Sequence, residues 1–418
     1  MEVWQERGLA IANSNTIEKN KLGWKVPSQS GNGAYIVNLD GSEPFCTCQF
    51  FETQHKKCQH IYAVEFVVQR EQRPNGTEVI TKTMSVTYAQ DWANYNAAQT
   101  HEQEHFVVLL RDLCNGIQQP EYRFGRPRLL LADVVFGLVF KSYTTMSGRR
   151  FTSALKEAQS TGLITKAAHY NSAFRYLENP ELTPLFKTLI EQSASPLRAV
   201  EIDFAVDSSG FATTTYARWF DHKYGKERTK QTWVKTHLIC GVTTHIVTSV
   251  EATPFESADN LQLPTLVSRT AKTFSINEVS ADKAYSDRKN LWAVQAQGGM
   301  AFIPFKVNST GMGDKHHKFD GLWNRMWYFY NFNRDAFLEH YHKRSNVETA
   351  FSMIKAKFGS SVRAKTPTAQ INEVLCKVLC HNICVLIQSI YELELEPTFW
   401  TFEAKEPVAL KVFEKTPF

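Results

Sequence analysis

AVEIDFAVDSSG, residues 199–210, is the stretch that decides the fold. Its apolar and β-branched residues predict a strand over residues 198–206, and Asp207 follows that strand. Two further segments rich in β-branched and aromatic residues come next, FATTTYARWF (211–220) and WVKTHLICGVTTHIVTSVEA (233–252). The pattern then alternates through a helix near 258–272, a short strand before Asp282, a helix at about 286–297 and the strand MAFIPFK (300–306). This order predicts an α/β fold, with a mixed sheet flanked by helices on both faces.

Two aspartates follow strand-like runs. Asp207 closes the first run, and Asp282 lies in INEVSADKAYSD (276–287). Strands fix the position of a side chain while their ends admit substrate, so both aspartates are candidate site residues. The alternative for either one alone is a helix cap or a turn residue. Asp203 and Asp287 are nearby acids that compete for the same role.

A third acid lies in YHKRSNVETAFSMIK, residues 341–355. On a helix, its Tyr341, Arg344, Glu348 and Lys355 fall within roughly a sixth of the circumference. Apolar residues occupy the neighbouring arc: Val347, Ala350, Phe351, Ile354 and Phe358. One face therefore packs into a core while its margin presents an acid, two bases and a phenol. The alternative interpretation is an amphipathic helix with a solvated charged edge.

The pattern of these acids and their neighbours resembles that of the insertion-sequence DDE transposases, and in particular the bacterial group with the signature Tyr-x2-Arg-x3-Glu-x6-Lys. The six residues that carry the resemblance are Asp207, Asp282, Glu348, Tyr341, Arg344 and Lys355. The resemblance covers roughly residues 125–390 and includes the local contexts VDSSG and ADKAYSD. It implies a ribonuclease-H-like fold. It also implies an enzyme that cleaves double-stranded DNA at transposable-element ends and joins the 3′-hydroxyl to target DNA, acting as a homodimer.

The resemblance also implies a role for each site residue. Asp207 would bridge two Mg²⁺ (or Mn²⁺) ions per active site, with Asp282 and Glu348 each binding one. Such ions activate the nucleophile and stabilise the leaving group in phosphoryl transfer, and they prefer oxygen ligands. The three remaining residues would contact DNA, with Arg344 and Lys355 holding phosphates and Tyr341 bonding the backbone near the cleaved bond.

Two other functions compete with this one. The first alternative is a non-catalytic DNA-binding regulator derived from a transposase. The second is a ribonuclease-H-like nuclease that cuts DNA without joining it. The acids and the surrounding bases at their motif positions argue against a retired active site.

A second motif lies near the N-terminus, in PFCTCQFFETQHKKCQHIYAVEF (44–66). Cys46, Cys48, Cys58 and His60 form Cys-x-Cys-x9-Cys-x-His, a ligand set for one tetrahedral structural Zn²⁺. His55 is a substitute ligand with a poorer spacing. The motif resembles the SWIM zinc finger over roughly residues 25–70, and we expect it to bind DNA or a protein partner.

Basic residues suggest further DNA contacts. One group lies in the hairpin expected after Asp207: Arg218, Lys223, Lys226, Arg228, Lys230 and Lys235. A turn and a second helix beginning with Arg149 and Arg150 fit a helix-turn-helix-like reader, with Arg149, Arg150 and Lys156 towards DNA, or a helical support. Trp323 and Trp327 are expected in the core, with base stacking as the alternative.

The 418 residues fit a chain of several domains, and the formal net charge of +5 is too small to demonstrate nucleic-acid binding by itself. We expect a zinc module at 1–85, a helical linker and DNA-binding segment at 86–195, a catalytic domain at 196–393 and a tail at 394–418. The other cysteines are expected to be buried and unpaired: Cys114, Cys240, Cys376, Cys380 and Cys384. The last three recur every four residues, for which a second metal site is the alternative. Thiolate zinc ligands, the absence of a signal segment and the absence of a bilayer-spanning apolar run predict a cytoplasmic protein without a membrane partner. The resemblance to the transposases implies that this cytoplasm is bacterial and that the protein is nucleoid-associated when bound.

Overall fold

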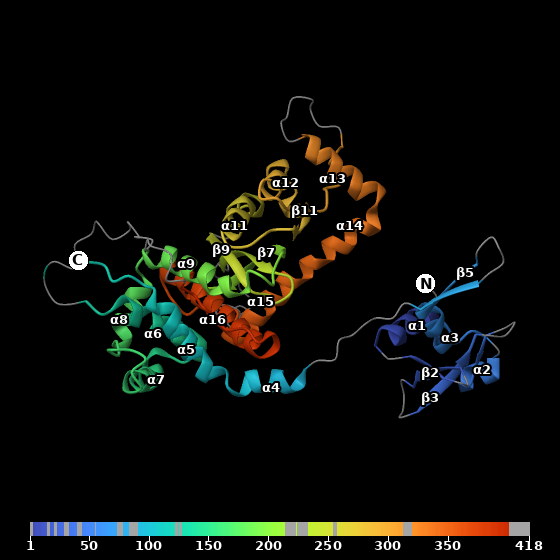
Figure 1. Cartoon of the computed structure of the whole chain (residues 1–418), viewed down its shortest axis with the longest axis horizontal. Coiled ribbons are helices and arrows are strands. Elements are labelled where there is room, and N and C mark those ends of the chain that lie inside the picture. The colour runs from blue at the N-terminus through green and yellow to red at the C-terminus, as the bar shows by residue number, and fades with distance from the viewer. Residues whose placement is uncertain are drawn as a thin grey trace. The chain divides into compact units, whose positions relative to one another are not determined.

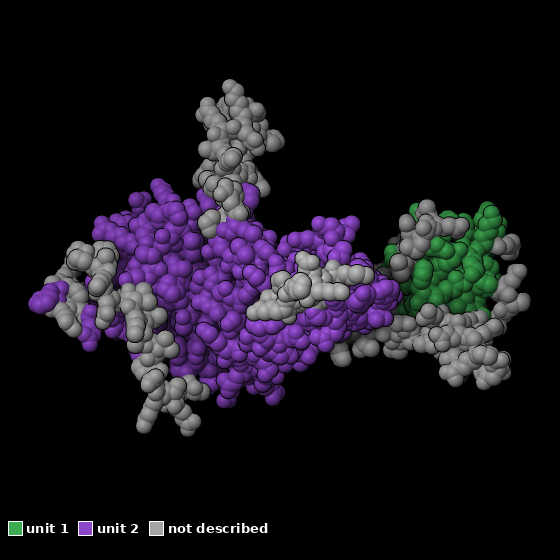
Figure 2. All heavy atoms as spheres, turned by 90° about the horizontal axis from the view of Figure 1, so that it is seen from above, with its two compact units in different colours: residues 1–90 green, residues 91–418 purple. Residues whose placement is uncertain are grey.

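The computed structural model of the chain describes these residues: 3–14, 17–20, 23–28, 33–39, 44–54, 56–72, 78–82, 91–121, 124, 128–213, 223, 233–253, 257–311 and 320–400. They belong to two compact units, Met1–Gln90 and Asp91–Phe418, which Figure 2 colours separately. The finer division at residues 85, 195 and 393 stays a prediction.

The first unit packs three helices against a small antiparallel sheet of order β1-β2-β3-β4. Its elements are α1 (Val3–Ser14), β1 (Glu18–Asn20), β2 (Gly23–Pro27), β3 (Ala34–Asn38), β4 (Phe45–Cys46), α2 (Gln49–Gln54), α3 (Gln59–Val67) and the hairpin β5 (Val68–Gln72) with β6 (Glu78–Lys82). Helices α1 and α3 approach closely at Gly8, where an added Cβ would lie 2.6 Å from Tyr62 Cβ. Glycine is the residue that permits such an approach.

The second unit begins with helices: α4 (Trp92–Thr100), α5 (Glu102–Asn115), α6 (Leu131–Thr144), α7 (Gly148–Ser160), α8 (Tyr170–Leu177), α9 (Leu182–Ala194) and the 3-10 turn η1 (Ser195–Leu197). They share one hydrophobic core with the sheet that follows. Helix α6 is buried over most of its surface, which is why its sequence LADVVFGLVF has no polar face. Residues 145–147 connect α6 to α7, as the turn-and-second-helix pattern predicts.

A five-stranded mixed sheet forms the centre of this unit, with the order β11-β10-β7-β8-β9. Its strands are β7 (Asp203–Ala212), β8 (Trp233–Gly241), β9 (Val247–Thr253), β10 (Glu278–Ala281) and β11 (Met300–Phe302). Strands β7, β8 and β9 are antiparallel neighbours, whereas β10 runs parallel to β7 and to β11. The predicted α/β fold, a ribonuclease-H-like mixed sheet flanked by helices, is confirmed.

Helices cover both faces of the sheet, as Figure 1 shows for α11 (Leu263–Thr270) and α12 (Arg288–Gln295) on one side and for α15 (Ser345–Phe358) and α16 (Pro367–Leu393) on the other. Neighbouring residues of β7 point to opposite faces. Phe204 meets Phe274, just after α11, with ring centroids 5.6 Å apart. Phe211 lies beneath Lys355 of α15 and Lys377 of α16. The remaining elements are the 3-10 turns η2 (Asp259–Leu261), η3 (Lys283–Tyr285) and η4 (His342–Arg344) with α13 (Asp320–Phe332) and α14 (Arg334–Tyr341).

Several predicted boundaries were wrong. The first strand runs over Asp203–Ala212 instead of 198–206, so Asp207 lies within β7 and not at its end. Pairing with β8 continues past Asp207 to Ala212, which extends the strand beyond the apolar run. The segment 233–252 divides into β8 and β9, because Gly241 N bonds to Ile246 O across a turn. Most of 211–220 lies outside the described residues.

Helix α16 is long and apolar enough to cross a membrane by length and composition, with a mean hydropathy of 1.6, which corrects the expectation of no such run. Of its 18-residue apolar stretch, 78% is buried, because α16 is the core helix of this unit. Cys376 and Cys380 lie on its buried surface, and Cys384 is partly buried. Among the described residues, these three cysteines do not form a group with metal-ligand spacing.

Candidate active site

The central strand β7 presents its acids to one face of the sheet. Asp203, Asp207 and Ser209 alternate along the strand, so their side chains leave it on the same side. That side is covered by η4 and α15, since Lys343 contacts Asp203, Arg344 contacts Asp207 and Lys355 contacts Ser209. The acids of β7 therefore face the helix that carries Glu348.

Strand β10 brings Asp282 to the same place. Its parallel register with β7 pairs Glu278 with Asp203 and Ala281 with Val206. Asp282 comes directly after Ala281 and so leaves the sheet beside Asp207. The Asp282 side chain caps η3, with its Oδ1 accepting a hydrogen bond from Lys283 N at 2.6 Å. Asp282 is thus a cap of η3 and also lies beside Asp207 at the candidate site.

Glu348 lies in the first turn of α15. The expected single helix from residue 341 onward is wrong in detail, because α14 ends at Tyr341 and η4 separates it from α15. The apolar arc is as predicted, with Val347, Ala350 and Ile354 buried against the sheet. The Glu348 side chain is 56% exposed, so its carboxylate lies at the solvent edge of the site.

A single nitrogen of Arg344 joins two of the acids. Its Nη2 donates to Asp207 Oδ2 at 2.9 Å and to Glu348 Oε1 at 2.6 Å. The guanidinium nitrogen thus stands where one cation meets oxygens from both carboxylates. The pKa of the Tyr341 phenol is raised, chiefly by burial. The charge of Arg344 and its hydrogen bond with the phenol act in the opposite direction.

Lys355 completes the group from the next turns of α15. Its Nζ donates to Ser209 Oγ at 2.6 Å, and burial lowers the pKa of this lysine. The pocket between β7 and α15 has a volume of about 600 Å³ and opens to solvent. It is lined by Asp207, Ser208, Ser209, Glu348, Phe351, Ser352, Lys355 and Ala356.

Asp207 has the most enclosed carboxylate of this pocket. Burial raises the pKa of Asp207, against the hydrogen bond from Ser208 N and the charge of Arg344, which lower it. The negative charge of Asp282 raises it further.

The two competing acids are engaged elsewhere. Asp203 binds Lys343 Nζ through Oδ2 at 2.7 Å and accepts from Asn277 Nδ2 through Oδ1 at 2.8 Å. Asp287 caps α12 by accepting from Lys289 N at 2.8 Å. Both are therefore structural acids.

The donor set suits a hard divalent cation. Asp207 and Glu348 offer oxygens to one shared position, Asp282 adds a third carboxylate nearby, and Mg²⁺ binds such oxygens while retaining waters. The three carboxylates do not all lie within 4.8 Å of one another, a spacing that among the described residues only the N-terminal cysteine–histidine group reaches. Arg344 Nη2 lies between two of them, Asp207 and Glu348.

That N-terminal group forms a zinc-binding site. Cys46 ends β4, Cys48 precedes α2, and Cys58 and His60 lie at the start of α3. All four are buried, and one ligand atom from each lies within 4.8 Å of the others. The hydrogen bond between Cys46 and Cys58 lowers the pKa of Cys58 and raises that of Cys46, so Cys58 is the thiol that ionises more readily. His55 lies outside the described residues.

The proposed DNA-contacting bases are only partly described. Arg218, Lys226, Arg228 and Lys230 lie outside the described residues, and Lys223 is exposed. Lys235 forms an ion pair with Asp259 at 2.6 Å.

The candidate DNA contacts on α7 are exposed. Arg149, Arg150 and Lys156 all face solvent there, while Phe151 and Leu155 pack inward. In the core, Trp323 and Trp327 donate their indole hydrogens to Thr310 O and Ser309 O, which favours packing over base stacking for both.

Sequence reasoning missed Glu278 and Lys343, which contact each other beside the pocket at 2.5 Å. A signal existed, because Glu278, Ser280 and Asp282 alternate along β10 as Asp203 and Asp207 do along β7. Lys343 directly precedes Arg344 in the motif.

Comparison with known families agrees with both motifs. Residues 199–383 match the family model described as a transposase DDE domain. Residues 35–69 match the model of the SWIM zinc finger. The chain thus carries a transposase DDE domain and, ahead of it, an N-terminal SWIM zinc finger.

Proposed function

We propose that the chain cleaves double-stranded DNA at transposable-element ends and joins the freed 3′-hydroxyl to target DNA. Asp207, Asp282 and Glu348 would hold two Mg²⁺ (or Mn²⁺) ions. The observation that carries the proposal is the contact of one Arg344 nitrogen with both Asp207 and Glu348, in a pocket beside Asp282. The match to a transposase DDE domain gives the coarser activity, cutting and joining DNA.

The side chains divide the work by their positions. Bound divalent ions supply activation of an oxygen nucleophile and stabilisation of the leaving oxygen. Arg344 and Lys355 place positive charge on either side of Glu348, where they would bind phosphates of the DNA backbone. Tyr341 would orient the backbone near the cleaved bond. The exposed Glu348 carboxylate lies at the edge from which DNA enters.

The partners follow from this chemistry. Element termini and target are both double-stranded DNA, and pairing of two ends favours a homodimer. The described bases that would meet DNA outside the pocket are Lys223, Arg149 and Arg150. The zinc finger would bind DNA or a protein partner, and the work would take place in the bacterial cytoplasm, at the nucleoid.

The test uses the full chain with zinc, labelled DNA carrying the termini of its own element, and Mg²⁺. We expect nicked ends, then products joined to a target plasmid. Asp207→Asn, Asp282→Asn and Glu348→Gln should each abolish cleavage while terminus binding in a mobility-shift assay persists. Normal nicking by any one of them would remove that residue from the site.

The same assay separates the two alternatives. Binding without cleavage by the unaltered chain would indicate a transposase-derived regulator. Cleavage without joined products would indicate a nuclease without strand transfer.

A further inference from the structure

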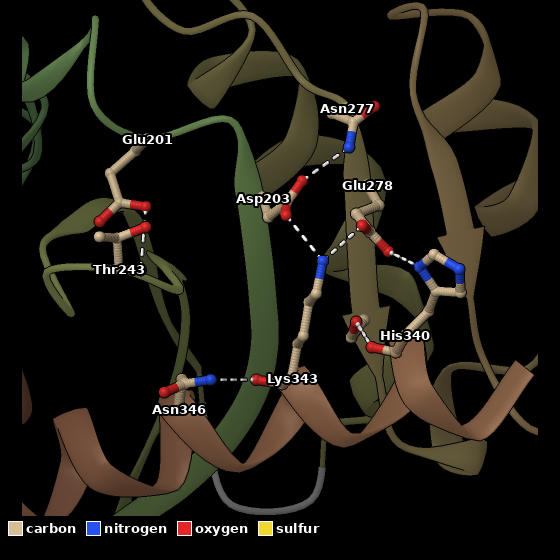
Figure 3. A network of polar contacts seen from close by, with 9 residues as sticks. Glu201, Asp203, Thr243, Asn277, Glu278, His340, Lys343 and Asn346 are labelled. Atoms are coloured by element: carbon tan, nitrogen blue, oxygen red, sulfur yellow. Dashed lines mark hydrogen bonds and ion pairs between the residues drawn. The ribbon is translucent and has the colours of Figure 1, made fainter. Parts of the chain in front are cut away.

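Beside the pocket, the same two strands carry a second pair of acids. Asp203 of β7 and Glu278 of β10 are register partners on the parallel strands. Lys343 Nζ lies between them, 2.7 Å from Asp203 Oδ2 and 2.5 Å from Glu278 Oε1 (Figure 3). These hydrogen bonds raise the pKa of Lys343 even though burial on its own would lower it. The lysine is therefore held charged between the two strands.

Three more contacts join His340, three residues before Lys343, to the strands. His340 Nδ1 lies 2.6 Å from Glu278 Oε2, and its ring stacks on Phe302 with centroids 4.2 Å apart. Ser280 Oγ donates to His340 O at 2.9 Å. Residues 340–343 are thus attached to β7, β10 and β11 immediately before Arg344.

All four carboxylate oxygens of this second pair have partners. Asp203 Oδ1 accepts from Asn277, and the other three oxygens meet Lys343 or His340. The Glu278 side chain is only 6% exposed. Neither acid of this pair lines the pocket, so we assign the pair a role different from that of Asp207.

We infer that Asp203, Glu278, His340 and Lys343, which we call the lysine clamp, are positioning residues for the metal site. The clamp joins the strands that carry two of the acids to the helix that carries the third. A helix turns by about 100° per residue, so a slip of one residue at η4 would swing Glu348 away from Asp207. The inference rests on the proposed function, because it assigns the clamp to the same site.

Stability alone is a poor explanation for such a set. Glu278 loses its hydration on burial and Lys343 stays partly exposed, so the ion pair contributes little net stability compared with apolar residues of similar size. What a salt bridge across two strands and a helix turn does provide is a fixed geometry. Here that geometry ends one residue before Arg344.

The experiment measures Mn²⁺ binding to the full-length, zinc-loaded chain by electron paramagnetic resonance, without DNA. We expect Lys343→Met to weaken Mn²⁺ binding at least fivefold, and Lys343→Arg to restore most of the loss. In a Glu348→Gln background, Lys343→Met should change the affinity less than twofold, because the ligand through which the clamp acts is already missing. The variant Asp203→Asn/Glu278→Gln/Lys343→Met leaves no unpaired buried charge, and should fold and show the same weakening.

Lys357→Met is the matched control. Lys357 lies on the same helix and binds Glu102 of α5, away from the pocket lining. It should lower thermal stability without changing Mn²⁺ affinity. If Lys343→Met and Lys357→Met altered the affinity equally, or if Lys343→Met left it unchanged, the clamp would not position the site. A complete lack of Mn²⁺ binding by the unaltered chain would instead overturn the proposed function, and the inference with it.

Discussion

Two pairs of acids lie on the same face of β7 and β10, four residues apart along each strand, and they differ in how their oxygens are used. In the closed pair, Asp203 and Glu278, every oxygen has a partner within the fold. In the open pair, Asp207 and Asp282, Asp207 lines the pocket, where Arg344 links it to an exposed Glu348. Carboxylates thus serve structure at one step and a candidate site at the next, and the difference is that Asp207 lines the solvent-open pocket whereas Asp203 and Glu278 do not.

The largest expected effect comes from neutralising each pair in turn. Asp207→Asn should lower DNA-end cleavage about a thousandfold or more, because a metal-bound carboxylate supplies several kcal/mol of transition-state stabilisation. Asp203→Asn should retain cleavage within about tenfold, since it acts only through position. Gel-based cleavage rates measure both. Equal losses would erase the distinction between the pairs.

Stability should show the opposite order. Lys343→Met leaves Glu278 buried without its lysine and should cost about 2–3 kcal/mol, less than the ~3–5 kcal/mol of a fully buried pair because Lys343 is partly exposed. Glu348→Gln should cost less than about 1 kcal/mol, since its partner contact is at the surface. Urea unfolding of the two variants gives the comparison. A larger cost for Glu348→Gln would contradict it.

A substitution of Arg344 tests whether Asp207 and Glu348 form a cation site that the arginine occupies. Because its Nη2 occupies the position between Asp207 and Glu348, Arg344→Gln should tighten Mn²⁺ binding, by roughly three- to tenfold or about 1 kcal/mol. Lys355→Gln is the control, since Lys355 contacts Ser209 and no carboxylate in the pocket. Weaker binding by Arg344→Gln would show that the arginine supports the ligands instead of competing with the ion.

The smallest effect concerns the outer edge of the closed pair. Asn277→Ala removes the donor to Asp203 Oδ1 and should reduce the free energy of unfolding by about 0.5–1 kcal/mol, as for one partly exposed hydrogen bond. Cleavage should be unchanged. A loss of cleavage without a loss of stability would mean that the pairs are coupled through Asp203.

The sequence by itself determined the mixed α/β fold and the zinc ligands, because periodicity and the spacing of ligands are local properties of the chain. It also placed Asp207 and Asp282 near strands and Glu348 on an amphipathic helix, with Arg344 and Lys355 beside it. Only the tertiary structure decided that β10 pairs with β7 in the register that sets Glu278 beside Asp203. The closed and open pairs look alike in sequence, since the acids of both pairs lie in or directly after strand segments with alternating side chains. Their difference depends on which side chain of a distant helix reaches them, and that is fixed by packing across the sheet.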